Sequence, residues 1–269
     1  MIKSPCKAKP PPELGRPAGK GVPGAASRTN TDRGYDETLT MQAWEQFLTG
    51  MNDHGHLSVR HMIERSWSRS ASSGVDARAS ATPLVADDDQ LHQNRRQNRH
   101  LLAAADQTFQ HAANLLEETS AMVVLTDREG VILDTRGDNR TLDAGHDIKL
   151  EPGGNWNEDV VGTNGIGTAL STGEPVFVHA AEHFCEGIKA WTCAGAPIRD
   201  PLDRSIVGLI DISGPPEIFL RHNFALSVLA AEQIELALGE QARAERLRLL
   251  EACLSSVPVG NGADGVVVL

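Results

Sequence analysis

The chain has 269 residues, a formal net charge of -11 and only 4% aromatic residues. This length can hold one large domain, or one domain with tails, and a core built on Leu, Val, Ile and Ala. The acidic balance argues against direct DNA binding by the folded body. No apolar run is long enough to span a membrane, and the four cysteines lack a disulfide-framework spacing. We therefore expect a cytoplasmic protein with reduced thiols and no membrane partner.

The first part of the chain predicts a tail followed by helices. Residues 1–37 are rich in Pro, Gly, Lys and Arg. They contain too few large apolar side chains to order themselves, so we expect a disordered basic tail. Residues 38–86 are expected to form a helical N-terminal extension, with helices at 38–50 and 58–70. Gly50 is expected to end the first of these helices.

The helix predicted at 58–70 has an apolar side and a basic side. Ser58 is expected to cap it. Ile63 and Trp67 lie four residues apart and would anchor one side on the domain. Arg65 and Arg69 form either a basic edge or, as is more usual on a single helix, a solvated face.

A long helix is predicted from Asp87 to about Glu118, because consecutive Asp residues suit the positive end of a helix dipole. An imperfect heptad stripe runs along it. The stripe favours either packing on the domain's own sheet or a parallel helix bundle between two copies. Its members are Asn98, Leu102, Ala105, Phe109, Ala112 and Leu116.

Four apolar runs predict antiparallel strands. Residues 121–126 and 131–135 are joined by a tight turn that ends in glycine, and 190–199 and 205–213 are joined by an Asp-Pro turn. Residues 138–152 are polar and are expected to form a loop with a short helix. With the flanking helices, these strands indicate the α/β (α+β) class, with a central antiparallel sheet.

The part of the chain with the most structural signals surrounds residues 162–165, a Gly-Thr-Asn-Gly sequence that predicts a turn. Asn155 and Glu158 have capping-box spacing, which predicts a short helix. A second helical turn is predicted at 166–171, followed by a strand at 175–179. The glycines fit neither a P-loop nor a dinucleotide fingerprint. We interpret the two short helices as a lid over a pocket, with polar groups for a ligand supplied by Thr163, Asn164 and Thr168.

A histidine and two thiols follow within a short stretch. His183, Cys185 and Cys193 could hold a metal ion, but no Cys-x-x-Cys pair and no fourth ligand accompany them. We therefore expect no metal and no cofactor. The apolar strand around Cys193 favours a buried thiol. His183 and Phe184 are candidates to face a ligand, and Trp191 is either a core residue or an aromatic clamp.

The C-terminal part contains an acid in an apolar strand and a long helix. Asp211 needs a partner if it is buried, and backbone amides are expected before a ligand. A last helix is predicted from Glu217 to about Cys253, apolar in its first half and charged in its second. It acts either as a signalling rod to a downstream domain or as a solvated helix end.

Several of these segments together resemble a known family. WNEDVVGTNGIGTAL at 156–170, the Trp-Thr-Cys and Ala-Pro-Ile-Arg-Asp-Pro motifs and GLIDISG at 208–214 are similar to the N-terminal GAF sensor of the acetoin-catabolism regulators. These are bacterial sigma-54-dependent (Fis-type) transcriptional activators. The resemblance begins at about residue 58. It implies a GAF domain with flanking long helices at 87–253 and the start of a truncated PAS-like segment at 254–269.

The resemblance implies a regulatory sensor and no enzyme activity. It implies that a small organic effector binds, that the chain forms a homodimer, and that flanking helices signal to output domains or to a full-length regulator. No Walker A or helix-turn-helix pattern is present, so we expect a truncated or stand-alone sensor. The alternatives are a thiol-based methionine sulfoxide reductase using Cys185 and Cys193, or a ligand-independent interaction module. The residues expected to bind the effector are Trp156, Thr163, Asn164, Thr168, His183, Phe184, Trp191 and Cys193.

Overall fold

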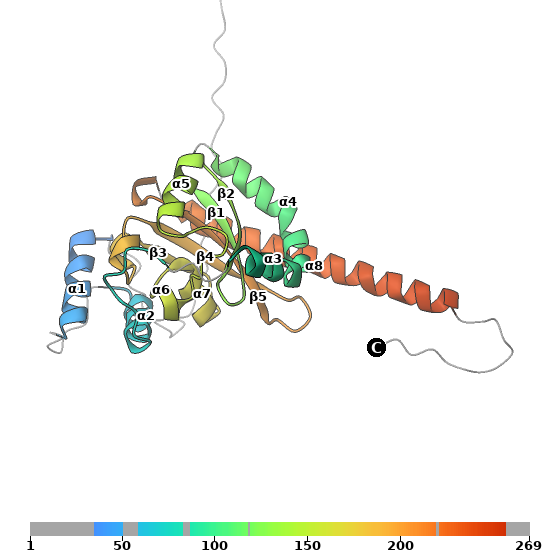
Figure 1. Ribbon diagram of the computed structural model, residues 1–269, viewed down its shortest axis with the longest axis horizontal. Coiled ribbons are helices and arrows are strands. Elements are labelled where there is room, and N and C mark those ends of the chain that lie inside the picture. Colours follow the sequence, from blue (N-terminus) through green and yellow to red (C-terminus); the bar gives the residue numbers. More distant parts are fainter. Residues whose placement is uncertain (1–34, 51–58, 83–86, 118, 219–220, 257–269) are drawn as a thin grey trace, which may run out of the picture. The chain divides into compact units, whose positions relative to one another are not determined.

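Five antiparallel strands form one sheet in the order β2-β1-β5-β4-β3 (Figure 1). The computed structural model describes residues 35–50, 59–82, 87–117, 119–218 and 221–256. The predicted antiparallel sheet and both of its hairpins are confirmed. The strands are β1 (Met122–Asp127), β2 (Ile132–Gly137), β3 (Val176–His179), β4 (Thr192–Arg199) and β5 (Ile206–Gly214).

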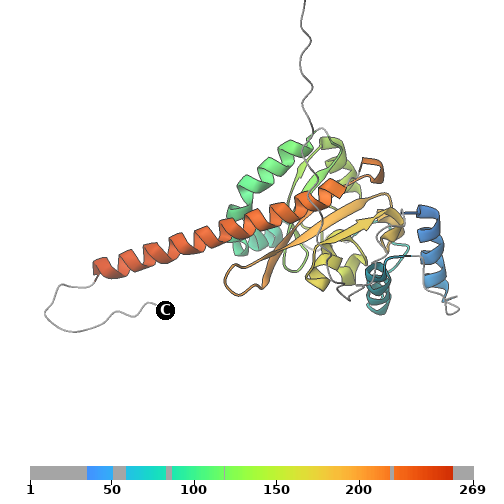
Figure 2. The same cartoon turned by 180° about the vertical axis from the view of Figure 1, so that it is seen from behind.

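The sheet separates two apolar cores, because successive strand side chains point to opposite faces. In β1, Met122 and Val124 join the core shared with the N-terminal helices, whereas Val123 and Leu125 join the core under the long helices. Helices α4 (Arg99–Leu116) and α8 (Arg221–Ser256) cover that second face (Figures 1 and 2). The first face carries α1 (Glu37–Thr49), α2 (His61–Ser72), α6 (Glu158–Val161) and α7 (Gly165–Thr172).

The helix predicted at 87–118 is two helices, so that prediction is wrong at its centre. Asn98 leaves helical geometry at φ -96° and ψ 20°, between α3 (Asp88–Gln97) and α4. Its side-chain amide donates to the Asn94 carbonyl, and such local side-chain bonds compete with a continuous helix. The rest of the predicted stripe packs on the domain's own sheet, with buried residues Ala105, Phe109, Ala112 and Leu116.

The N-terminal helices belong to the same core as the sheet. Gly50 ends α1 at φ 66°, as predicted. Helix α2 begins at His61 with Arg60 as its cap, so the predicted start is wrong; Ser58 lies outside the described residues. Ile63 and Trp67 are both fully buried, which confirms their anchoring role.

The remaining elements complete the domain. The predicted short helix after β2 is α5 (Asn139–Asp147), and α8 begins at Arg221, after a short 3-10 turn η3 (Pro216–Ile218), and not at Glu217. Two further 3-10 turns, η1 (Ala180–Glu182) and η2 (Glu186–Ile188), connect β3 to β4. Within the described ranges, no helix is both long and apolar enough to cross a membrane. The predicted tail at 1–37 and the segment at 254–269 lie mostly outside those ranges.

Candidate functional site

Asn164 builds the turn between α6 and α7. Its Oδ1 atom accepts hydrogen bonds from the backbone amides of Ile166 (2.8 Å) and Gly167 (2.9 Å), which caps α7. Its Nδ2 atom donates to the carbonyls of Trp156 (3.1 Å) and Gly162 (2.8 Å). Two donors and two acceptor positions are the full capacity of an amide side chain. In this structure the Asn164 side chain is therefore fully used in holding its own turn.

Two glycines let α7 lie directly on the sheet. A Cβ atom at Gly165 would lie 2.5 Å from Cys193 Cβ and 2.6 Å from Asp211 Oδ1. A Cβ atom at Gly167 would lie 2.3 Å from the backbone nitrogen of Glu158. Real Cβ atoms do not approach other atoms so closely. The N-terminal turn of α7 therefore touches the middle of β4 and β5 with no side chain between them.

A buried polar chain lies beneath this contact. His183 Nδ1 is 3.0 Å from the Ala180 carbonyl, and His183 Nε2 is 3.4 Å from Cys193 Sγ. Ser213 Oγ lies 3.2 Å from the same sulfur and also bonds Asp211 Oδ2. These four side chains, from the β3–β4 connection, β4 and β5, are all buried. Sequence reasoning selected His183, Cys193 and Asp211 separately but did not foresee that they form one chain.

Burial shifts the side chains of this polar chain toward their uncharged forms. It lowers the pKa of His183 to about 3 and raises the pKa of the Cys193 thiol. It also raises the pKa of Asp211 to about 7, although hydrogen bonds from Ser213 and the Ala194 backbone lower it. Ser213 has one hydroxyl hydrogen for two neighbours. A protonated Asp211 can donate to Ser213, Ser213 to Cys193 and Cys193 to neutral His183, so that each hydrogen is used once.

Asp211 keeps one polar atom without a partner. Its Oδ1 atom is buried and makes no hydrogen bond, while it faces the Cα atom of Gly165. A buried unpaired oxygen costs about 1–3 kcal/mol. Asp211 was predicted to need a hydrogen-bond partner if buried. Its Oδ2 atom has one in Ser213, whereas its Oδ1 atom has none. The Asp211 Oδ1 atom therefore has the capacity to accept a further hydrogen bond.

The aromatic candidates are parts of the core in this structure. Trp156 is buried, and its Nε1 atom donates to the Lys149 carbonyl at 2.9 Å. Phe184 fills the space that a side chain at Gly162 would occupy. Trp191 is also buried and belongs to the same apolar cluster. These three rings belong to the apolar core on the same face of the sheet as α6 and α7.

The loop that carries His183 is fixed by α1. Lys189 Nζ donates to the carbonyls of Ala181 (2.8 Å) and His183 (2.6 Å) and lies 4.2 Å from the centre of the Trp44 ring. Trp44 Nε1 in turn donates to the Phe184 carbonyl at 2.9 Å. Burial lowers the pKa of Lys189 to about 7. The N-terminal extension therefore holds one wall of the candidate site in place.

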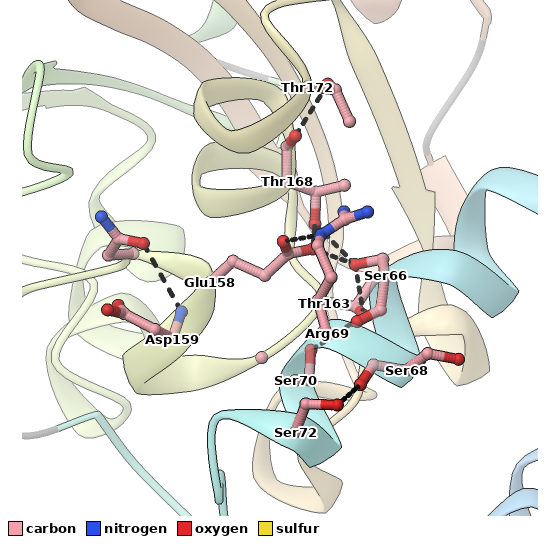
Figure 3. Close-up of polar contacts among 12 residues, drawn as sticks. Ser66, Ser68, Arg69, Ser70, Ser72, Glu158, Asp159, Thr163, Thr168 and Thr172 are labelled. Atoms are coloured by element: carbon pink, nitrogen blue, oxygen red, sulfur yellow. Dashed lines mark hydrogen bonds and ion pairs between the residues drawn. The ribbon is translucent and has the colours of Figure 1, made fainter.

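A second buried polar cluster joins α2 to α6 and α7 (Figure 3). Arg69 Nε donates to Glu158 Oε2 at 2.6 Å, and Ser66 Oγ donates to Glu158 Oε1. Thr168 Oγ1 also donates to Glu158 Oε1, at 3.0 Å, and Ser66 Oγ lies 2.6 Å from Thr163 Oγ1. A cleft of about 430 Å³ opens beside this cluster, between α2 and α6.

This cluster corrects two expectations. Glu158 does not complete a capping box with Asn155, because Asn157 caps α6 and the Glu158 carboxylate turns to α2. Arg69 does not lie on a solvated face but pairs with a buried carboxylate. The Thr163 and Thr168 hydroxyls, predicted to bind a ligand, contact Ser66 in this structure.

Both thiols near the site are buried. Burial raises the pKa of Cys185 to about 11, and its Sγ atom donates to the Val161 carbonyl at 3.0 Å. Cys193 has the raised pKa described above. A reactive cysteine needs a lowered pKa and access to solvent. In the part of the chain that the structure describes, no three His, Cys, Asp or Glu side chains gather in a geometry suited to a metal ion.

An antiparallel sheet in the order 2-1-5-4-3, with long helices on one face and short helices over a polar centre on the other, defines a GAF-type domain. The chain belongs to the family described as "MimR, N-terminal domain", whose family model matches residues 37–235. The predicted resemblance to the acetoin-catabolism regulators is confirmed by the relatives of the chain.

Two curated relatives are transcriptional activators. The chain is 32% identical over 224 residues to the acetoin dehydrogenase operon transcriptional activator AcoR of Bacillus subtilis (strain 168). It is 34% identical over 222 residues to the propane 2-monooxygenase operon transcriptional activator MimR of Mycolicibacterium smegmatis. Each match covers 81% of this chain and 36% of the relative. The chain thus spans about a third of the length of these relatives.

A solved structure shares the fold. The crystal structure of the E. coli DhaR(N)-DhaL complex aligns with a TM-score of 0.67 at 21% identity. The alignment covers 73% of this chain and 68% of that chain. At this identity the likeness concerns the fold alone, and it agrees with the predicted GAF architecture.

Proposed function

We propose that this domain senses a small, uncharged polar effector, which binds between α7 and strands β4 and β5. The observation that carries this proposal is the buried Asp211 Oδ1 atom, which has no partner and faces Gly165. An effector hydroxyl inserted there would donate to this oxygen. A neutral polar ligand fits because burial keeps His183 neutral and favours the protonated form of Asp211.

The effector must be small, and it must move α7. Gly165 lies against β4 and β5 so closely that even a methyl group would not fit. Binding therefore separates the α6–α7 segment from the sheet and exposes His183 and Cys193 to the effector. Trp156, Phe184 and Trp191 then provide the apolar walls. Thr163 and Thr168 move with the segment and are the further contacts that this proposal includes, and Asn164 contributes through the turn that its side chain holds.

The relatives suggest the chemical class of the effector. Their names connect them with operons for acetoin dehydrogenase and propane 2-monooxygenase. Acetoin is a small hydroxyketone, and propane oxidation yields alcohols and ketones of similar size. We propose an effector from this group of short hydroxyketones, alcohols and ketones, with the domain acting in the cytoplasm.

We propose that the signal passes to the helices that contact the α6–α7 segment or the sheet beneath it. Glu158 on α6 is bonded to α2, and α8 lies across the opposite face of β4 and β5. A shift of α7 therefore acts on both α2 and the sheet that supports α8. In this proposal two copies act together, and their output passes to the ATPase and DNA-binding domains of an activator. An effector can do this only if it binds the two states with different affinities.

Enzyme activity is not part of this proposal. The alternative reductase reaction would need an accessible thiolate, whereas both Cys185 and Cys193 are buried with raised pKa values. The relatives are transcriptional activators by name. The thiol of Cys193 instead takes part in the buried polar chain with His183 and Ser213.

A thermal-shift screen tests the effector class. The full chain is heated with short hydroxyketones, diols, alcohols, ketones and carboxylates, with 5,5'-dithiobis-nitrobenzoate labelling as a parallel measure of thiol access. A ligand at 100 times its dissociation constant adds about 2.7 kcal/mol of stability. We expect a selective rise in melting temperature with an uncharged member and slow labelling of both buried thiols. No shift with any compound, or a shift with carboxylates only, contradicts the proposed effector class.

A further inference from the structure

Helix α8 carries an exposed apolar seam that continues beyond the domain. Its first half lies on the sheet through Ala230, Ala231 and Ile234, which are buried. Its second half extends away from the sheet (Figures 1 and 2). Leucines recur along the whole helix at alternating steps of three and four residues, except at the three polar positions described below. The described members are Leu226, Leu229, Leu236, Leu247, Leu250 and Leu254.

This leucine spacing is typical of a coiled coil. It differs from the spacing of the α8 residues that pack on the domain's own sheet. Steps of three and four residues place side chains on one stripe that faces a partner helix. The residues that α8 buries on its own sheet, such as Ala230 and Ile234, lie on a different stripe. Leu229, Leu236, Leu247 and Leu254 are exposed. A helix with this much apolar surface in water is expected to have a partner.

Three polar residues interrupt the seam, and two of them have opposite charges. Gln233, Glu240 and Arg243 occupy seam positions at the correct spacing. If two copies of α8 ran parallel and in register, Glu240 would face Glu240 and Arg243 would face Arg243. If the copies ran antiparallel, Glu240 of each would face Arg243 of the other. The same register places Leu236 opposite Leu247 and Leu229 opposite Leu254.

The first half of α8 also provides a groove of matching length. A groove of about 440 Å³ lies between α4 and α8 and is lined by Leu115, Leu229 and Leu236. The α8 segment 226–240 that borders it and the bare segment 243–256 each extend for roughly 20 Å at 1.5 Å per residue. The free segment of one copy is therefore long enough to cover the groove of the other. A two-fold axis makes the contact reciprocal.

We propose that α8 binds a second copy of this chain in an antiparallel coiled coil, with the segment 243–256 of each copy in the α4–α8 groove of the other. Glu240 and Arg243 set the register through two equivalent ion pairs. This inference rests on the proposed function only in that the sensor acts as a pair. It concerns the chain without effector, so its failure would leave effector binding unaffected.

Two leucines make a matched test of the seam. Leu247 and Leu249 are both 55% exposed on α8, but two residues on a helix lie about 200° apart. Leu247→Glu changes the seam, and Leu249→Glu changes another stripe. Sedimentation equilibrium of the full chain is expected to show a dimer for the unmodified chain and for Leu249→Glu. For Leu247→Glu we expect the dissociation constant of the dimer to increase at least about tenfold. A monomeric unmodified chain, or equal effects of the two substitutions, would overturn the proposal.

Cysteine cross-linking tests the direction. In a chain with Cys6→Ser and Cys253→Ser, the variants Leu236→Cys and Leu247→Cys are oxidised alone and mixed; Cys185 and Cys193 are buried. The antiparallel register predicts a disulfide-linked dimer in the mixture and little in either variant alone. Efficient cross-linking of Leu236→Cys with itself indicates a parallel pair and contradicts the proposal.

Discussion

Arg69 of α2 and Glu158 of α6, 89 residues apart in the chain, form a bidentate ion pair. The guanidinium Nε and Nη2 atoms donate to the two carboxylate oxygens at 2.6 and 2.9 Å. The Glu158 side chain is 5% exposed and the Arg69 side chain is 36% exposed. This pair joins the N-terminal extension to the segment that carries the candidate site.

Arg69→Leu is expected to destabilise the fold by about 2–4 kcal/mol, because it leaves a buried carboxylate without its cation. Urea unfolding measures the loss. Arg65→Leu is the matched control, since Arg65 is exposed on the same helix. We expect a change within about 0.5 kcal/mol for the control. Equal stability of the two variants would show that the pair is a solvated contact.

Asn164→Ala is expected to lower stability by about 2–4 kcal/mol, since it removes the cap of α7 and two bonds to buried carbonyls. Asn157→Ala serves as the control. Asn157 caps the short α6 and donates one bond, to the Glu129 carbonyl, at an exposed site. A loss of about 1 kcal/mol or less is expected there. If Asn164→Ala unfolds no more easily than Asn157→Ala, the structural role given to Asn164 is wrong.

Gly165→Ala is expected to destabilise the domain by about 1–3 kcal/mol or more, because the new methyl group overlaps Cys193 and Asp211. Gly239→Ala on α8 is the comparison. Its new methyl group would meet Pro201 at 3.6 Å, an ordinary contact, so the helix is expected to gain up to about 1 kcal/mol. Thermal unfolding of both variants measures the contrast. If both substitutions changed the stability in the same direction, the close packing of α7 on the sheet would be contradicted.

The pH dependence of stability is expected to differ between the wild-type chain and Asp211→Asn. Burial raises the folded-state pKa of Asp211 from 3.8 to about 7. Between these values the unfolded carboxyl ionises first, so the unfolded state binds fewer protons and stability falls as pH rises. The asparagine variant has no such loss. Its stability relative to wild type should therefore increase from about pH 4 to about pH 7 and level off above.

The pKa shift of His183 changes the stability of the fold with pH in the opposite direction. Burial lowers its pKa from 6.5 to about 3, so its contribution to stability rises with pH over that range. This term, and that of Asp127 with its raised pKa, are present in both proteins and cancel in the comparison. Urea titrations at pH 4.5, 6 and 8 give the difference directly. A difference that does not change with pH would mean that Asp211 is not strongly shifted.

Local sequence patterns predicted most of the fold but little of the site. Gly50 ends its helix with positive φ, as its position indicated, because a left-handed residue leaves a local signature. The break at Asn98 was missed because the helical periodicity continues through it. Glu158 has the spacing of a capping box, but its partners on α2 are far away in sequence. No local rule could connect them.

The polar chain of His183, Cys193, Ser213 and Asp211 shows the same limit. Each residue has an ordinary local explanation, as a loop histidine, a strand cysteine or an acid in an apolar strand. Only the pairing of β4 with β5, which places Cys193 opposite Ser213, brings them together. The strand register was the missing information, and it is set by contacts across the whole sheet.

The most direct test of the proposed sensor is calorimetric titration of the best effector from the thermal-shift screen into three proteins. These are the wild-type chain, Asp211→Ala, which removes the accepting oxygen, and, as a control on the same sheet, Asp127→Ala. We expect Asp211→Ala to bind at least about tenfold more weakly, a loss of about 1.4 kcal/mol, and Asp127→Ala to bind as wild type does. Equal affinity of all three folded proteins would contradict an effector site between α7 and Asp211.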